Sequence, residues 1–230
     1  MSMLKYFISL ILLGAPLSLS AQIGRWAPSA VRIGVEPGAL GYMIFSEKRS
    51  FFEATADLDI NNFYLAMDYG INTFKLDEPT YQYENNGRYM RFGMDINLMK
   101  ADKIYNVMFF GLRYARSVFN DELKYQTSAV IQSDTRWPSA KASVSNSNVK
   151  SNWIEMTVGM KIRIFKQLYA GFTARYKFLK SIRDAGNLKP YYIPGFGKNI
   201  NNDAWGLNYY IYYRIPFRKK VIYVRDEPGE

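Results

Sequence analysis

The chain has 230 residues, 30 Lys and Arg against 20 Asp and Glu, and a formal net charge of +10, and it contains neither Cys nor His. The lack of both residue types excludes disulfide frameworks, thiolate nucleophiles, Ser-His and Cys-His dyads, and metal sites built on Cys or His. Hydrophobic residues make up 48% of the sequence and aromatic residues 17%, so the chain folds. We expect a protein that is not an enzyme and has no catalytic, cofactor-binding or metal-binding residues.

The first 21 residues have the features of a secretory signal peptide. Lys5 precedes an apolar run at 6–13, which is too short to cross a bilayer as a helix and so disfavours an uncleaved membrane anchor. The small residues that follow favour cleavage after Ala21, with cleavage after Ser20 as the alternative. No Cys follows the run, which excludes a lipid-anchored lipoprotein.

Eight later segments alternate between apolar and polar residues, a pattern typical of β-strands with two unlike faces. In chain order they cover residues 31–36, 52–60, 63–72, 90–98, 107–115, 154–164, 168–178 and 205–217. The apolar rows of these segments contain no charged residue. The fifth segment is the least regular, because Val107 and Phe109 fall on its polar row.

The connections between these segments alternate in length. Residues 61–62, 99–103 and 165–167 form short connections, whereas about 37–51, 73–89, 118–153 and 179–204 form long ones. Short turns on one side and long loops on the other are typical of outer-membrane barrels. The sequence therefore predicts an all-β fold, an eight-stranded antiparallel transmembrane β-barrel with short periplasmic turns and long extracellular loops. The predicted domains are a signal peptide at 1–21, the barrel at 22–217 and a periplasmic C-terminal tail at 218–230.

Size decides which row faces the interior, because a secreted barrel of the lipocalin kind shows the same alternation with its apolar row inside. The apolar rows hold about forty side chains, many of them aromatic, and the interior of an eight-stranded barrel is only just filled by ordinary side chains. Glycines recur on the polar rows, where space would be short. We therefore expect the apolar rows to face lipid, with a soluble barrel or sandwich as the alternative.

The polar rows carry charges of both signs in near balance. We expect these charges to pair into a hydrogen-bonded core, because a buried charge without a partner is costly. The predicted lumenal charge network comprises Arg32, Glu36, Glu53, Asp57, Asp59, Asp68, Arg91, Asp95, Arg113, Glu155, Lys161, Arg163, Arg175, Lys177 and Arg214. One alternative is a polar path for protons or ions, and another is acid–base chemistry by Asp57 and Asp59.

Aromatic residues also cluster in the long connections. The candidate partner-binding loop consists of Tyr191, Tyr192, Ile193 and Phe196, and such clusters either mark a partner surface or fold over the mouth of a barrel. The excess positive charge lies in loops, turns and the tail. Solubility and anchoring in outer-membrane lipid are its first explanation, and anionic lipopolysaccharide or another envelope protein is the second. We expect no nucleic-acid partner for an exported barrel.

Several strings resemble a family of small outer-membrane barrel proteins from Bacteroidota that is catalogued only as a domain of unknown function. They are GLRYARS at 111–117, WIE at 153–155, LYAG at 168–171, YIPGF at 192–196 and GLNY at 206–209. The resemblance covers roughly residues 25–220, and YIPGF is its most specific part. It implies an outer-membrane location and eight strands, with no established activity or site residue. Lipid A deacylases, outer-membrane phospholipases and omptin proteases differ, because each depends on a His.

Two hypotheses on function follow for a protein in the outer membrane of a Gram-negative bacterium. The first is a structural or interaction role, as a component or partner of a cell-envelope complex that is bound through the loops or the tail. The second is a small pore or lateral-gate transporter for ions or small apolar molecules, which the many small residues of the polar rows favour. Neither hypothesis requires a cofactor.

Overall fold

The structure is a computed structural model of the chain, and it describes residues 27–38, 49–99, 105–127 and 140–217. The strands are β1 (Ala30–Val35), β2 (Arg49–Ile60), β3 (Phe63–Glu78), β4 (Tyr81–Asn97), β5 (Val107–Thr127), β6 (Ala140–Phe165), β7 (Leu168–Arg183), β8 (Tyr192–Ile193), β9 (Gly197–Lys198) and β10 (Asp203–Pro216). The predicted signal peptide and C-terminal tail lie outside the described residues. Within the described ranges, no helix has the length and apolar character needed to cross a membrane.

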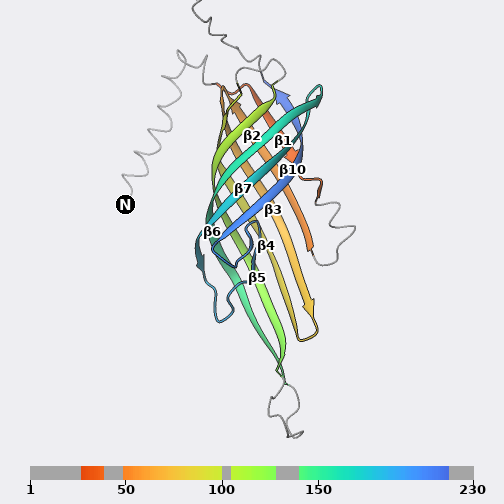
Figure 1. The fold of residues 1–230 in the computed structure, drawn as a ribbon, viewed down its shortest axis with the longest axis vertical. Coiled ribbons are helices and arrows are strands. Elements are labelled where there is room, and N and C mark those ends of the chain that lie inside the picture. The colour runs from red at the N-terminus through yellow and green to blue at the C-terminus, as the bar shows by residue number, and fades with distance from the viewer. Residues whose placement is uncertain (1–26, 39–48, 100–104, 128–139, 218–230) are drawn as a thin grey trace, which may run out of the picture.

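Eight strands form a closed antiparallel ring in the order β1, β10, β7, β6, β5, β4, β3, β2 (Figure 1). The ring closes where β1 pairs with β10, with Ile33 opposite Tyr213. The remaining strands, β8 and β9, form a separate two-stranded hairpin. The predicted all-β fold with eight antiparallel strands is confirmed.

Side chains alternate between the inside and the outside of the ring. In β3, Leu65 is 49% exposed and Met67 is 50% exposed, whereas Tyr64 and Asp68 are 2% and 0% exposed. The apolar rows therefore lie on the outside and the polar rows on the inside. The two irregular residues of the fifth segment follow the same geometry, because Val107 and Phe109 are buried on the inner face of β5 and pack against Tyr64.

At one end of the ring, neighbouring strands are joined by connections of two residues. Asn61 and Asn62 join β2 to β3, and Lys166 and Gln167 join β6 to β7. Asn61 has a φ of 62°, a left-handed conformation that Asn adopts more readily than most residues. Tight hairpin turns of this kind match the twist of the strands that they connect. The predicted short connection at 61–62 is confirmed, the one at 165–167 consists of 166–167 only, and most of the one at 99–103 lies outside the described residues.

Two of the predicted long loops are wrong, because most of their residues are strands. β3 continues to Glu78 and β4 begins at Tyr81, while β5 continues to Thr127 and β6 begins at Ala140 (Figure 1). The outer face of these extensions is polar, with Lys75 paired to Glu84 across β3 and β4. The alternation between an apolar and a polar row therefore ends at the extensions, although the backbone ladder continues.

Glycine makes room inside the ring. A Cβ atom on Gly70 of β3 would collide with the ring and hydroxyl of Tyr89, which projects inward from the neighbouring strand β4. The glycine on the polar row therefore gives space to a large side chain opposite it, as its position in the sequence predicts.

Candidate functional site

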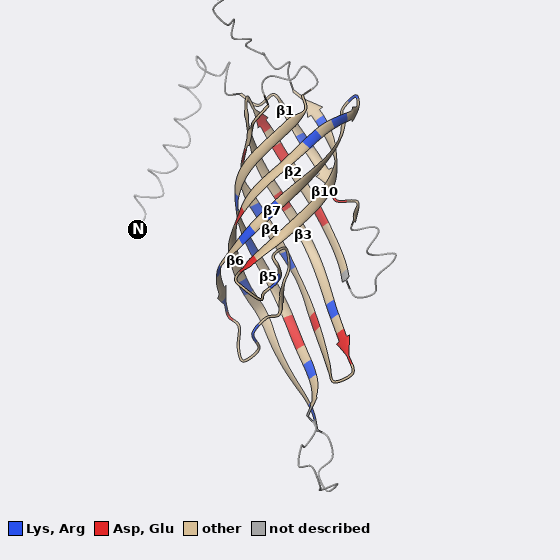
Figure 2. Ribbon diagram, in the orientation of Figure 1, with Lys and Arg blue, Asp and Glu red and all other residues tan. Residues whose placement is uncertain are grey.

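The interior of the ring holds a buried set of seven cations and seven carboxylates. Figure 2 shows Lys and Arg beside Asp and Glu on neighbouring strands across the middle of the ring. Each of these side chains belongs to a residue at most 7% exposed: Arg32, Glu36, Glu53, Asp57, Asp59, Asp68, Arg91, Asp95, Arg113, Glu155, Lys161, Arg175, Lys177 and Arg214. They are called the charge network below.

Arg163 does not belong to the charge network, which corrects the sequence interpretation. Its side chain is exposed near the end of β6. The ladder between β6 and β7 is irregular between Arg163 and Phe165, just before the two-residue connection. Arg163 itself is still in register opposite Tyr169, and its side chain is exposed because the residue lies at the end of the ring.

Asp68 of β3 lies at the centre of the charge network. Its Oδ2 accepts hydrogen bonds from Arg113 Nη1 at 2.5 Å and from Arg175 Nη2 at 3.1 Å. A third guanidinium, that of Arg91, lies 3.6 Å from the same oxygen, and Thr55 Oγ1 donates to Oδ1 at 2.7 Å. Four strands thus direct donors at a single carboxylate, which stabilises its charge away from water.

Glu155 of β6 connects two of these arginines. Its Oε1 accepts from Arg91 Nε at 2.9 Å, and its Oε2 accepts from Arg175 Nη1 at 2.9 Å. The indole Nε1 of Trp153 donates to Oε1 at 2.7 Å. Both carboxylate oxygens therefore have charged donors, and the indole satisfies part of the remaining acceptor capacity.

Glu53 of β2 is contacted by two phenols and two arginines, with Arg175 Nη2 3.8 Å from its Oε1. Arg91 Nη1 lies 2.8 Å from its Oε1, and the hydroxyls of Tyr89 and Tyr210 donate to its two oxygens. Sequence reasoning did not place these tyrosines in the site. Their position on the inner row is a usable signal, because Tyr210 lies on the polar row of its segment.

A second cluster lies closer to the two-residue turns. Asp57 accepts from Arg32 Nε at 2.8 Å and from Lys161 Nζ at 2.7 Å. The Lys161 ammonium also lies 4.8 Å from the ring centroid of Phe109 and 5.2 Å from that of Tyr212, within the range of cation–π attraction.

The β8–β9 hairpin enters the ring and contacts the charge network with its backbone. Lys177 Nζ donates to the carbonyl oxygens of Gly195 and Phe196 at 2.8 Å and 3.0 Å. Arg91 Nη2 donates to the same Gly195 oxygen at 3.1 Å. Gly195 has a φ of 79°, and a Cβ atom there would meet the ring of Tyr89, so this turn requires glycine on both counts.

The candidate partner-binding loop is therefore mostly inside the molecule. Ile193 and Phe196 are fully buried, Tyr192 is 4% exposed, and only Tyr191 is half-buried. Ile193 and Phe196 belong to one cluster with inward-facing residues of the ring, and the rings of Trp153 and Phe196 lie edge to face at 5.8 Å. Of the two interpretations left open above, folding into the mouth is the one that the structure shows.

A second layer of contacts holds the hairpin to the strand extensions. The rings of Tyr192 and Phe74 stack with centroids 4.5 Å apart. The hydroxyl of Tyr192 accepts from Asn72 Nδ2 at 3.1 Å, and its carbonyl oxygen accepts from Asn85 Nδ2 at 2.9 Å. We call the hairpin and its flanking residues, 188–199, the plug.

Asp121 is a buried carboxyl of the β5 extension, beyond the apolar rows. It accepts hydrogen bonds from Tyr83 OH at 3.0 Å and from Asn146 Nδ2 at 2.8 Å. Burial raises the pKa of Asp121 above its ordinary value, although the hydrogen bonds from Asn146 and Tyr83 lower this pKa. Asn146 also donates to the Leu188 carbonyl oxygen at 2.8 Å, which links this carboxyl to the plug.

The geometry favours charge pairing over chemistry. Asp57, one of the two aspartates of the alternative acid–base pair, is bound by two cations. The carboxylates at the centre of the charge network accept hydrogen bonds from arginines and phenols. In the part of the chain that the structure describes, no three acidic side chains are grouped so as to hold a metal ion.

Comparison with known proteins gives one family. A family model described as "Domain of unknown function (DUF6048)" matches residues 3–220, which includes all strands of the ring. A comparison with curated proteins finds no match.

Proposed function

The chain belongs to the DUF6048 family, a domain of unknown function, and we propose that it is an outer-membrane β-barrel with a structural or interaction role in the cell envelope. The ring would cross the bilayer, and its filled interior would keep the barrel rigid. The strand extensions would project from the membrane toward a partner. Outer-membrane lipid, including lipopolysaccharide, would surround the barrel, and another envelope protein would be its partner.

The inverted distribution of polarity carries this proposal. Charged side chains fill the inside of the ring, while large apolar side chains such as Phe92 and Leu207 are more than half exposed on its outside. Water is a poor solvent for a continuous band of this kind, whereas hydrocarbon is a good one. A closed ring also satisfies the backbone hydrogen bonds that a bilayer cannot satisfy.

The orientation follows from the connections. The two-residue turns would face the periplasm, as in other barrels of this kind, and the extensions of β3 to β6 would face the outside. β10 ends at Pro216, which pairs with Ala30 next to Asp59 and so lies on the side of the two-residue turns; we propose that the predicted tail is periplasmic on this ground.

The filled interior favours an interaction role over the pore hypothesis. Arg91, Glu155 and Trp153 fill the middle of the ring and are fully buried, and the plug lies on top of them. The extensions, by contrast, form a four-stranded sheet that continues past its neighbours in the ring. β3 runs beyond its last pairing with β2 at Phe74, and β6 begins before its first pairing with β7 at Lys150. Among the described residues, no strand pairs with β3 or β6 on these sides, and strand edges of this kind can pair with a partner strand.

Refolding with and without a membrane tests the proposal. We expect the purified chain to fold in lipid vesicles, to float with them in a density gradient and to aggregate in detergent-free buffer. A chain that is monodisperse and folded in plain buffer would refute membrane insertion. Two further measurements separate the roles: co-purification from gently solubilised outer membranes supports a partner, whereas reproducible current in planar bilayers supports the pore.

A further inference from the structure

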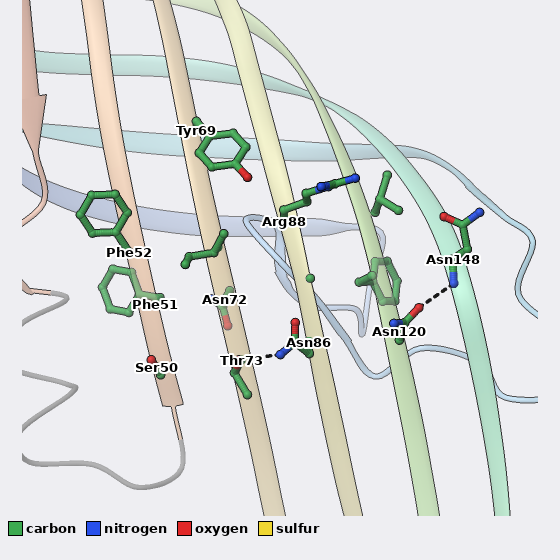
Figure 3. A pocket seen from close by; sticks show the side chains of 14 residues that line it. Ser50, Phe51, Phe52, Tyr69, Asn72, Thr73, Asn86, Arg88, Asn120 and Asn148 are labelled. Carbon is green, nitrogen blue, oxygen red and sulfur yellow. Dashed lines mark hydrogen bonds between the residues drawn. The ribbon is translucent and has the colours of Figure 1, made fainter.

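A groove of about 560 Å³ lies across the outer face of β2 to β6, where the exposed apolar rows end (Figure 3). Its apolar part consists of Phe52, Tyr69 and Ile71, which are 44–49% exposed. Its polar part is formed toward the extensions by Thr73 and by the exposed Asn86, Asn120 and Asn148. The groove therefore lies on the boundary between the apolar band and the polar strand extensions.

One arginine lines this groove, and a second lies diagonally opposite it on the neighbouring strand of the outer face. Arg88 lines it directly and extends from β4 toward β5 (Figure 3). Arg88 is opposite Val118 of β5. Arg116 lies two residues before Val118 in the same strand, opposite Met90. The Cα atoms of such diagonal neighbours are roughly 7–8 Å apart, so both guanidiniums can reach one ligand group. Both side chains are exposed.

The charge around the groove is positive. The residues that line it include no Asp and no Glu. Among the described residues, the ion pairs of the outer face include neither Arg88 nor Arg116. Lys150, on the same row as Arg88 and Val118, adds a cation that Asp184 neutralises at 2.8 Å. The two arginines are therefore left to bind an anion at the groove.

The polar part of the groove can bind hydroxyl groups. Asn86 Nδ2 donates to Thr73 Oγ1 at 3.1 Å, and Asn120 Oδ1 accepts from the backbone N–H of Asn148 at 2.7 Å, as the dashed lines of Figure 3 show. These bonds orient the amides and use one atom of each of the two side chains. The exposed side chains keep further donor and acceptor capacity, which is suited to a sugar.

From this juxtaposition we propose that the groove binds a phosphorylated glycolipid of the surrounding leaflet. Arg88 and Arg116 bind a phosphate, the asparagines and Thr73 contact the sugar, and the acyl chains lie along Phe52, Tyr69 and Ile71. Arginine suits the first contact because its planar donors match phosphate oxygens in pairs. The inference rests on the proposed function, since it requires that the apolar band lies in a membrane.

Native mass spectrometry of the full chain in detergent tests this site. Three lipids are added separately: a diphosphorylated lipid A, its dephosphorylated form and phosphatidylglycerol. The test variant is Arg88→Gln/Arg116→Gln. The control variant is Lys75→Gln/Lys124→Gln, which removes the same charge from exposed positions of the extensions.

We expect the unaltered chain to bind the diphosphorylated glycolipid at least about tenfold more tightly than the other two lipids, and the test variant to lose that preference. The control variant should keep it. Equal binding of the dephosphorylated form, equal binding of phosphatidylglycerol, or an equal loss in the control would each overturn the site. The comparison of lipids on the unaltered chain does not depend on how the variants fold. Failure to insert into vesicles would refute the proposed function, whereas insertion without lipid preference would refute only this site.

Discussion

The ammonium of Lys177 lies 2.8 Å from the carbonyl oxygen of Gly195, which joins a ring strand to the turn of the plug. Arg91 donates to the same oxygen at 3.1 Å and pairs with carboxylates through its other nitrogens. The plug is therefore attached by its main chain, and its side chains are free to pack against Trp153 and its neighbours.

Lys177→Met should loosen the plug without opening the ring. The substitution removes two charge-assisted hydrogen bonds, each worth about 1.5–3 kcal/mol, and leaves the Phe196 carbonyl oxygen without this donor. We expect amide hydrogen exchange in 192–198 to become about tenfold faster or more, as mass spectrometry of the protein in micelles can measure. Lys180→Met, at an exposed position of the same strand, is the control. Identical exchange in both variants would show that Lys177 does not hold the plug.

Asp68→Asn should destabilise the whole ring. The neutral amide leaves Arg113 and Arg175 buried with less compensating charge, and breaking a buried network by removing one partner costs about 3–5 kcal/mol. The free energy of unfolding can be measured by urea titration in vesicles with tryptophan fluorescence as the signal. Glu84→Gln breaks an exposed pair with Lys75 and should cost at most about 1 kcal/mol. A similar cost for the two variants would argue against a structural charge network.

Met67→Arg should impair insertion, since it places a charge in the middle of the exposed apolar band. A lipid-facing arginine costs about 2–4 kcal/mol at mid-membrane depth and much less near the surface. Ser145→Arg introduces the same charge at an exposed position of the β6 extension and should insert normally. The measurement is the fraction of chain that floats with vesicles after refolding. If Met67→Arg inserts as well as the control, the band does not face lipid.

Asp121→Asn should remove a pH dependence of stability. Because burial raises the pKa of Asp121 in the folded chain, the folded state holds this proton more tightly than the unfolded state. The group therefore favours folding most at low pH, and this contribution is lost as pH rises through the raised pKa. The amide oxygen can still accept from Asn146, whereas the amide nitrogen cannot accept from Tyr83, a loss that is the same at every pH.

The variant should accordingly gain stability relative to the unaltered chain between about pH 4 and pH 7. Urea titrations at both pH values measure the difference. An NMR titration of the Asp121 carboxyl measures its pKa independently. A pKa below the ordinary Asp value of about 3.9 would contradict the prediction.

The ring could be predicted because its signal is local. In β3 the alternation of Leu65 and Met67 with Asp68 is visible in a few adjacent residues, and a closed sheet of two unlike faces converts it into an inside and an outside. The same alternation, in which every second side chain points inward, also predicts most residues of the charge network. Arg163 keeps that alternation, opposite the buried Tyr169, but it is exposed because it lies close to the turn at the end of the ring, and the alternation alone does not show where the ring ends.

The extensions and the plug could not be predicted in the same way. The extensions have polar outer faces, so the criterion of an apolar row failed at Lys75 and Glu84 although the ladder continues there. The plug depends on contacts between distant residues, such as the hydrogen bond from Asn72 to Tyr192, which are 120 positions apart. The aromatic string around Tyr192 pointed to burial or binding, and only the arrangement of the strands distinguishes the two.

The joint between β1 and β10 has a consequence for how the molecule can be made. It brings together the first and last strands and consists of six residue pairs, whereas the ladder between β3 and β4 extends from Phe63 to Glu78. Residues 211–216 have to be synthesised before this joint can form in full, and β1 and β7 lack their common partner until β10 has been made. The cell therefore needs some means of shielding these two strand edges until the last strand is available.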